Sequence, residues 1–242
     1  MIPKVIWQTY KDPYDTLPVY MHASMDTWKY HNPDYEHKYM DDQQAAEFVL
    51  NEYGQEWYDI FMNVPVGVMR GDLWRYMIIY KYGGVYADLD TECLEPISKW
   101  MLEDKEMIVC PENTEHFCQW TFAATPGHPI IKSVLDHIKE VFKNPNYDQD
   151  HFVHIHTGPM AWTEGILKAL DIRVKDLIYD YDLLNESKYA KLYKFYCYGG
   201  GEQWRIFHFQ SVKHIYGSQK WNDGTYVQWI EDDLVKKNKR FT

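Results

Sequence analysis

The sequence predicts an α/β fold with a mainly parallel central sheet and added helices. Short strand patterns alternate with longer amphipathic helix patterns along the 242 residues. One helix pattern, at residues 65–82, ends at a glycine pair and leads directly into a strand that carries two aspartates. The sequence has no internal repeat, low-complexity tract or Gly/Ser linker, so we expect a single domain over residues 1–242.

The amino-terminal elements follow from apolar spacing and from helix-stop residues. The predicted strands are 2–7 and 35–40, and the predicted helices are 17–31 and 43–53. The first helix should end near Asn32, because Pro33 disfavours helical backbone in the residue before it. Gly54 follows the second helix as a stop.

The helix at 65–82 has the clearest boundaries. Pro65 fits a first-turn position, and Gly83 supplies the carboxyl-terminal stop. The strand that follows leads into Asp88 and Asp90. In sheets of this kind ligands gather at the carboxyl ends of the strands, so both aspartates should lie at a binding edge.

The carboxyl-terminal half continues the alternation of strands and helices. The predicted strands are 107–110, 120–124, a short strand around Tyr196 and 207–209, and the predicted helices are 129–143, 160–170 and 226–237. Pro159 stands near the start of the helix at 160–170.

Composition narrows the classes of function. A formal charge of −11 argues against a nucleic-acid groove. There is no apolar run of about 18 residues and no signal-peptide pattern, so we expect a cytoplasmic protein. The aromatic content of 17% suits either a large core or a site where rings stack on sugars and bases.

The cysteines show neither close pairing nor zinc-type grouping with histidine. They are Cys93, Cys110, Cys118 and Cys197. We expect reduced thiols, with two disulfides as the alternative.

Asp88 and Asp90 form the most informative pair in the chain. Side chains at i and i+2 leave a strand on the same face, so the two carboxylates should point the same way, with Leu89 on the other face. Carboxylates this close repel unless a cation lies between them or one takes up a proton. Their oxygens suit Mg²⁺ or Mn²⁺, which usually also bind phosphate oxygens. The pair therefore predicts a metal–diphosphate site.

Asp72 and Arg75 lie three residues apart on the preceding helix, so they share a face. One interpretation is a surface ion pair of little energetic value. The helix is otherwise rich in large apolar residues, however, and buried charges need a partner or a function. An arginine fork fits a diphosphate or a carboxylate, and a nearby aspartate accepts hydrogen bonds from sugar or ribose hydroxyls.

These residues together resemble the signature of the family 32 glycosyltransferases. The matching segments are Arg70-x-Asp72-x-x-Arg75, Gly83-Gly84-x-Tyr86-x-Asp88-x-Asp90 and Pro96. The spacing is also similar to that of the large clostridial glucosylating toxins. The resemblance implies a GT-A-type, Rossmann-like fold that binds a nucleotide sugar. A lone Asp-x-Asp is a weak motif, but with the upstream helix and glycine pair it is strong.

The resemblance covers most of the chain. Residues 2–10 resemble the family's opening strand, except that Trp7 stands where a histidine is usual. It implies that Gln8, Thr9 and Tyr10 contact the donor, with Tyr10 stacking on the base; core and strand-edge aromatics are the alternative for Trp7 and Tyr10. Three further segments match: 32–36, expected to be structural, and 125–129 and 157–159, expected to shape the far side of the pocket where the acceptor enters.

The histidines divide into two groups. His151, His154 and His156 alternate, which predicts one shared strand face, but no acidic or cysteine partner supports a zinc site there. His214, Ser218 and Trp221 resemble the family's closing motif, which implies a segment that folds over the donor. There His214 would complete the metal shell with Asp90, and Trp221 would cover the sugar–diphosphate, although an extra residue separates it from Ser218.

The resemblance implies a metal-dependent, retaining glycosyltransferase. It would move a hexose from a UDP- or GDP-linked donor to a glycan or glycolipid acceptor, with Mn²⁺ or Mg²⁺ as cofactor. Asp72, Arg75 and Asp88 form the expected catalytic set: Arg75 neutralises the diphosphate, Asp72 holds the donor sugar, and Asp88 orients hydroxyls. Asp90 and His214, with Asp88, form the expected metal set.

Two alternatives stay open at this point. One is a toxin-like or effector-like protein glycosyltransferase, and the other is an inactive nucleotide-sugar or glycan-binding module. The intact Asp72, Arg75, Asp88 and Asp90 argue against the second. The basic tail at 236–240 fits either a solvated helix end or a weak contact with an anionic membrane surface. The residues specify neither the sugar, the acceptor nor the oligomeric state.

Overall fold

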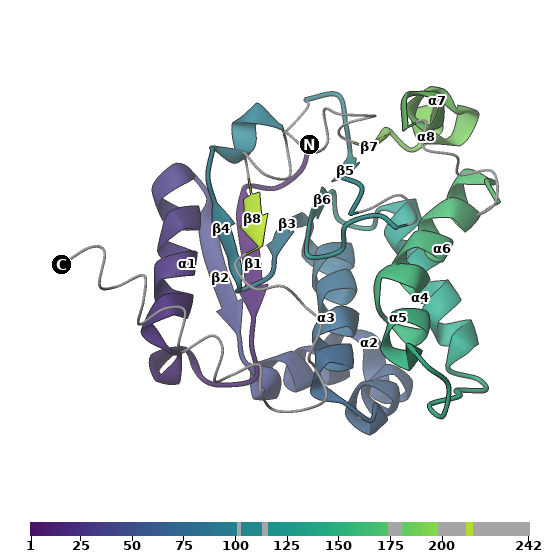
Figure 1. Cartoon of the computed structure of the whole chain (residues 1–242), viewed down its shortest axis with the longest axis horizontal. Coiled ribbons are helices and arrows are strands. Elements are labelled where there is room, and N and C mark those ends of the chain that lie inside the picture. Colours follow the sequence, from purple (N-terminus) through teal and green to yellow (C-terminus); the bar gives the residue numbers. More distant parts are fainter. Residues whose placement is uncertain (101–102, 113–115, 174–180, 198–211, 215–242) are drawn as a thin grey trace.

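A six-stranded sheet forms the centre of the molecule in the computed structural model, which describes residues 1–100, 103–112, 116–173, 181–197 and 212–214 (Figure 1). The strand order is β2-β1-β3-β6-β5-β7. The strands are β1 (Val5–Thr9), β2 (Glu36–Met40), β3 (Gly84–Ala87), β5 (Met107–Val109), β6 (Thr121–Ala124) and β7 (Phe195–Cys197).

The sheet is mixed, with parallel pairings in the majority among the described strands. β1 pairs in parallel with β2 and β3, and β5 with β7, whereas β6 runs antiparallel to both of its neighbours. The register places Ala87 opposite Thr121 and Gly84 opposite Ala124. The carboxyl end of β3 therefore lies beside the amino end of β6, and we call this end of the strands the edge of the sheet.

A second, two-stranded sheet extends this edge. β4 (Thr91–Cys93) pairs antiparallel with β8 (Val212–His214), which brings residue 214 opposite Thr91. Only three residues, 88–90, thus separate β3 from β4, and they include both aspartates of the motif.

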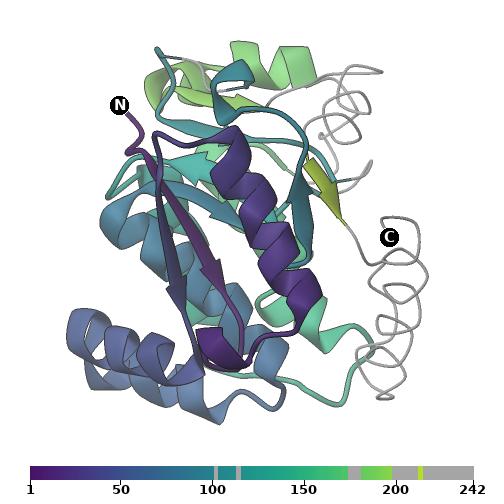
Figure 2. The ribbon, with the colours of Figure 1, turned by 90° about the vertical axis from the view of Figure 1, so that its left-hand side faces the viewer.

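Helices cover both faces of the large sheet. They are α1 (Val19–His31), α2 (Asp42–Asn63), α3 (Gly67–Tyr82), α4 (Pro129–Val141), α5 (Phe152–His156), α6 (Pro159–Leu170), α7 (Tyr181–Glu186) and α8 (Lys188–Leu192). Figures 1 and 2 show α1 on one side of the sheet and α2 to α6 on the other. None of the described helices is long and apolar enough to cross a membrane.

Strand alternation divides the core into two layers. Trp7, Tyr86 and Phe122 pack with the helices of the α3 side, whereas Ile6 and Val85 pack with Trp28 of α1. All four cysteines are buried free thiols, as the sequence predicts.

Most predicted elements are confirmed within two or three residues, and three details are wrong. The helix pattern at 43–53 does not stop at Gly54, because the chain kinks there at φ 79° and resumes a helical path to Asn63. The histidine segment forms α5 rather than a strand. Pro65 precedes α3 instead of occupying its first turn. The predicted elements at 207–209 and 226–237, and the basic tail, lie outside the described residues.

Candidate functional site

The two motif aspartates lie in the turn between β3 and β4. We expected both on one strand face, but β3 ends at Ala87 and the chain turns at Leu89 and Asp90. Leu89 is buried against Met21 and Met25 of α1, which anchors the turn to the molecule. The carboxylates are therefore placed by a turn, and their shared-face geometry does not follow from strand alternation.

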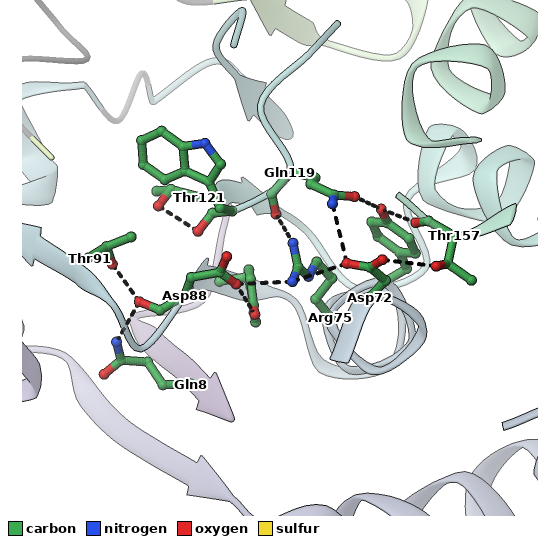
Figure 3. Close-up of polar contacts among 11 residues, drawn as sticks. Gln8, Asp72, Arg75, Asp88, Thr91, Gln119, Thr121 and Thr157 are labelled. Atoms are coloured by element: carbon green, nitrogen blue, oxygen red, sulfur yellow. Dashed lines mark hydrogen bonds and ion pairs between the residues drawn. The ribbon is translucent and has the colours of Figure 1, made fainter. Parts of the chain in front are cut away.

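The backbone of Asp88 is fixed on both sides. Its N–H donates to the Trp120 carbonyl at 2.8 Å. Its carbonyl accepts from the Gln8 amide at 3.3 Å and from the Thr91 hydroxyl and N–H at 2.5 and 3.2 Å (Figure 3). The turn is thus held by β1, β4 and the segment before β6 together.

Arg75 of α3 joins the helix to this turn. One terminal nitrogen lies 3.2 Å from Asp72 Oδ1 and 3.1 Å from Asp88 Oδ1, and the other donates to the Gln119 carbonyl at 3.2 Å. The guanidinium also lies 4.9 Å from the centre of the Tyr86 ring, whose hydroxyl donates to Asp88. The predicted pairing of Asp72 with Arg75 is confirmed, and it includes Asp88 (Figure 3).

Asp72 is buried and receives two further hydrogen bonds. The Gln119 amide donates to Oδ1 at 3.2 Å and the Thr157 hydroxyl to Oδ2 at 2.9 Å. Burial raises the pKa of Asp72 to about 7, although Arg75 and these two donors act in the opposite direction; Asp88 raises it further. Burial therefore makes the protonated form of Asp72 much more favourable than it is for an exposed aspartate.

Arg75 remains charged. Burial is the strongest single effect on Arg75 and opposes its charge, but Asp88, Tyr86 and Asp72 together outweigh it, so the pKa of Arg75 is raised well above the ordinary range. Its terminal nitrogens are occupied by the protein's own oxygens, while Nε is buried without a hydrogen-bond partner among the described residues. In this structure Arg75 holds Asp72 and Asp88 together.

The end of β1 lies beside the turn. Gln8 reaches Asp88, and the Thr9 hydroxyl donates to the Met40 carbonyl at 2.7 Å, which holds β1 to β2. The pKa of Tyr10 is raised by burial and then by Asp12 and Asp90, so Tyr10 lies in the electrostatic reach of Asp90.

Trp7 has a structural role. Its ring is buried, stacks on Tyr82 and donates to the Gly83 carbonyl at 2.9 Å. The core alternative considered for Trp7 is therefore confirmed.

The downstream segments fall at different places. Residue 214 ends β8 opposite Thr91, so its backbone lies next to the turn that carries Asp90. Ser218 and Trp221 lie outside the described residues. Thr157 contacts Asp72 directly, as above. The segment 125–129 follows β6 at the end of the sheet opposite to Asp88, so the expectation that it shapes the pocket is wrong.

Sequence reasoning missed Gln119 and underestimated Thr157. Both bind Asp72 although they are far from it in the sequence, and the packing of α5 and β6 against α3 brings them together. The one signal for them is that a buried carboxylate needs hydrogen-bond donors.

The oxygen ligands around the turn suit a hard cation that also binds oxygen atoms of its substrate. Asp88 and Asp90 supply carboxylate oxygens, which Mg²⁺ and Mn²⁺ prefer. Within the described ranges, no three His, Cys, Asp or Glu side chains gather closely enough to hold a metal ion by themselves.

Part of the chain, including the two motif aspartates, matches a known protein family. Residues 18–107 match the family described as "Glycosyltransferase sugar-binding region containing DXD motif". The "Initiation-specific alpha-1,6-mannosyltransferase" of Schizosaccharomyces pombe is 30% identical over 197 residues, covering 70% of this chain and 49% of the relative. The "Mannosyl phosphorylinositol ceramide synthase" of Saccharomyces cerevisiae is 38% identical over 169 residues, covering 66% and 40%.

The fold also has a counterpart among solved structures. The PaToxG glycosyltransferase superposes with a TM-score of 0.51 at 19% identity, covering 80% of this chain and 74% of that one. The likeness establishes a GT-A-type fold. The chain spans about half the length, or less, of the curated relatives it matches.

Proposed function

We propose that this chain, which carries the DXD-motif sugar-binding region of family 32 glycosyltransferases on a GT-A-type fold, transfers a sugar from a nucleotide-sugar donor to a glycan or glycolipid. The observation that carries the proposal is the Asp72–Arg75–Asp88 network at the end of β3, next to the turn with Asp90. A hydrolase that uses the acidic pair alone would not explain why an arginine of α3 contacts both the buried Asp72 and the partly exposed Asp88.

The sugar is proposed to be mannose. The relatives named above are a mannosyltransferase and a mannosyl phosphorylinositol ceramide synthase, and inositol phosphoceramide mannosyltransferases of Schizosaccharomyces pombe also match. Their acceptors differ, so the acceptor of this chain is proposed only as a carbohydrate or a glycolipid head group.

Asp88 and Asp90, with His214, would hold a divalent cation, Mn²⁺ or Mg²⁺. When bound, such a cation neutralises the charge that develops on the leaving diphosphate. Asp88 is pre-set for this by its fixed backbone and by its bond to Arg75. Because Arg75 compensates only part of the charge of its two carboxylates, the site keeps the negative charge that attracts a cation.

Asp72 and Arg75 would orient the donor sugar. When ionised, the Asp72 carboxylate accepts hydrogen bonds from hydroxyls, and Arg75 holds that carboxylate in place. Tyr10, near Asp90, would stack on the base. For an α-linked donor we propose retention of anomeric configuration by a front-face mechanism that requires no protein nucleophile.

A screen of nucleotide sugars tests the proposal. UDP- and GDP-linked hexoses, each with Mn²⁺ and with a chelator, are assayed for release of the nucleoside diphosphate and for transfer to mannosides. We expect cation-dependent release from GDP-mannose above all other donors. Release from no donor would refute the activity, and a β-linked product from an α-linked donor would refute retention.

A further inference from the structure

His37 of β2 is connected to the motif turn through one buried side chain. Its Nε2 atom lies 2.6 Å from Gln8 Oε1, and the Gln8 amide nitrogen lies 3.3 Å from the Asp88 carbonyl oxygen. Gln8 is 0% exposed. Both ends of its amide therefore bind protein groups, and the connection crosses three neighbouring strands at the edge where β3 ends.

The direction of each hydrogen bond in this connection follows from its last member. A backbone carbonyl can only accept, so the NH₂ group of Gln8 must face Asp88 and its amide oxygen must face His37. An amide oxygen also only accepts, so His37 must carry a proton on Nε2. Burial lowers the pKa of His37 to about 4, and nearby Lys29 acts in the same direction, so near neutral pH this proton is the single one on the ring.

The chain of bonds fixes one conformation of the turn. In this conformation Asp88 presents its carboxylate to Arg75 and its carbonyl to Gln8 and Thr91. Rotation of the Gln8 amide would place two oxygens against each other at Asp88, and the Nε2–H of His37 prevents that rotation. Removal of this donor would leave the buried Gln8 oxygen unsatisfied.

We propose that His37 is a positioning residue for the donor site, acting through Gln8 on the Asp88 turn. The effect of His37 on donor kinetics rests on the proposed function, whereas its effect on the conformation of the turn does not. It also changes the expected role of Gln8. Its amide oxygen and nitrogen are bound to His37 and Asp88, so Gln8 supports the turn and has no free amide atom for the nucleotide sugar.

Nuclear magnetic resonance of the imidazole nitrogens tests the structural part without any substrate. In the intact chain at pH 7, His37 should give the neutral ring with hydrogen on Nε2. A neutral ring with hydrogen on Nδ1 would overturn the proposal, because Gln8 would then lack its donor.

Matched variants test the kinetic part. His37→Gln keeps an N–H donor near the Nε2 position, whereas His37→Leu removes it. We expect His37→Leu to lose about tenfold in kcat/KM through a higher KM for the donor, with kcat nearly unchanged, and His37→Gln to recover most of the loss. Equal losses in both variants, or no loss in His37→Leu, would overturn the proposal.

His128→Leu serves as the control. His128 is also a buried histidine whose Nε2 lies 2.9 Å from a carbonyl oxygen, that of Tyr193, but it lies beyond β6 at the other end of β3. Its loss should lower thermal stability without raising the donor KM. If the unmodified chain turns over no nucleotide sugar, the proposed function fails while the resonance test of His37 still decides the positioning.

Discussion

Asp72 couples the site to pH through its buried proton. Its folded pKa of about 7 lies above the ordinary aspartate value of 3.8. The folded state therefore binds more protons than the unfolded state between these values, so this group's contribution to stability is complete below about pH 4 and is lost as pH rises through about 7.

Asp72→Asn tests this contribution. The free energy of unfolding should fall for the unmodified chain, relative to the variant, as pH rises from about 4 to about 7, and the difference should then level off. Urea unfolding of both proteins at a series of pH values measures it. A difference that does not change with pH would show that Asp72 stays ionised in the folded chain.

Arg75 should not tolerate lysine. A single ammonium cannot reproduce the planar fork that serves Asp72, Asp88 and the Gln119 carbonyl at once. We expect Arg75→Lys to lower the free energy of unfolding by about 3 kcal/mol, because the buried Asp72 carboxylate loses its network with Arg75 and Asp88. Arg70→Lys is the control: its partly exposed pair with Asp42 at 3.4 Å should change stability by less than about 1 kcal/mol. Similar losses in both variants would contradict this account.

At the scale of single residues, sequence reasoning found the charged members of the site but not their geometry. Helix spacing predicted that Asp72 meets Arg75, since residues three apart share a face. The position of Asp88 could not be derived, because strand periodicity does not reveal that β3 ends at Ala87. Gln119 and Thr157 join Asp72 only through tertiary packing.

Among the elements, the contact of α4 with α6 depends on a glycine. A Cβ atom built on Gly165 would lie 2.5 Å from the Val134 Cα, so the two helices approach at backbone distance. We expect Gly165→Ala to push them apart and to lower the free energy of unfolding by about 2–3 kcal/mol.

Gly71→Ala is the matched control for that variant, since Gly71 is also helical but has open space around its Cβ position. It should raise the free energy of unfolding by about 0.5–1 kcal/mol through helix propensity. Chemical denaturation of both variants decides the matter. Equal effects of the two alanines would mean that the close approach of α4 and α6 is not a constraint.

The order and type of most elements followed from local pattern, whereas their interruptions did not. Glycine at position 54 predicts a helix stop. The chain does turn there at positive φ, but it resumes a helix because residues beyond it, such as Phe61, are buried in the core. The histidine spacing at 151–156 fits a strand, but Phe152 and Val153 pack on the helical side, which favours α5. Tertiary burial decided both cases.

For the whole molecule, the sheet edge explains why distant segments act together. β1 supplies Gln8, α3 supplies Arg75 and the β3–β4 turn supplies Asp88, and β8 ends opposite Thr91. Parallel strands β1 and β3 end at the same edge, so the fold itself brings these segments together. The predicted α/β class is confirmed, and the antiparallel direction of β6 is the part that local pattern could not supply.

The central claim is that the Asp88–Asp90 turn binds a nucleoside diphosphate together with a divalent cation. It is tested most directly by the melting temperature of the chain with Mn²⁺ and GDP or UDP present together, compared with each alone. Asp90→Ala is the test variant. Asp59→Ala, which changes an aspartate on α2 that binds Gln55, is the control.

At ligand concentrations about 100-fold above Kd, the intact chain and Asp59→Ala should melt on the order of 5–10 °C higher with both ligands than with either alone. Asp90→Ala should lose this increase. No increase with any nucleoside diphosphate in the intact chain, or an increase that Asp90→Ala retains in full, would contradict the account.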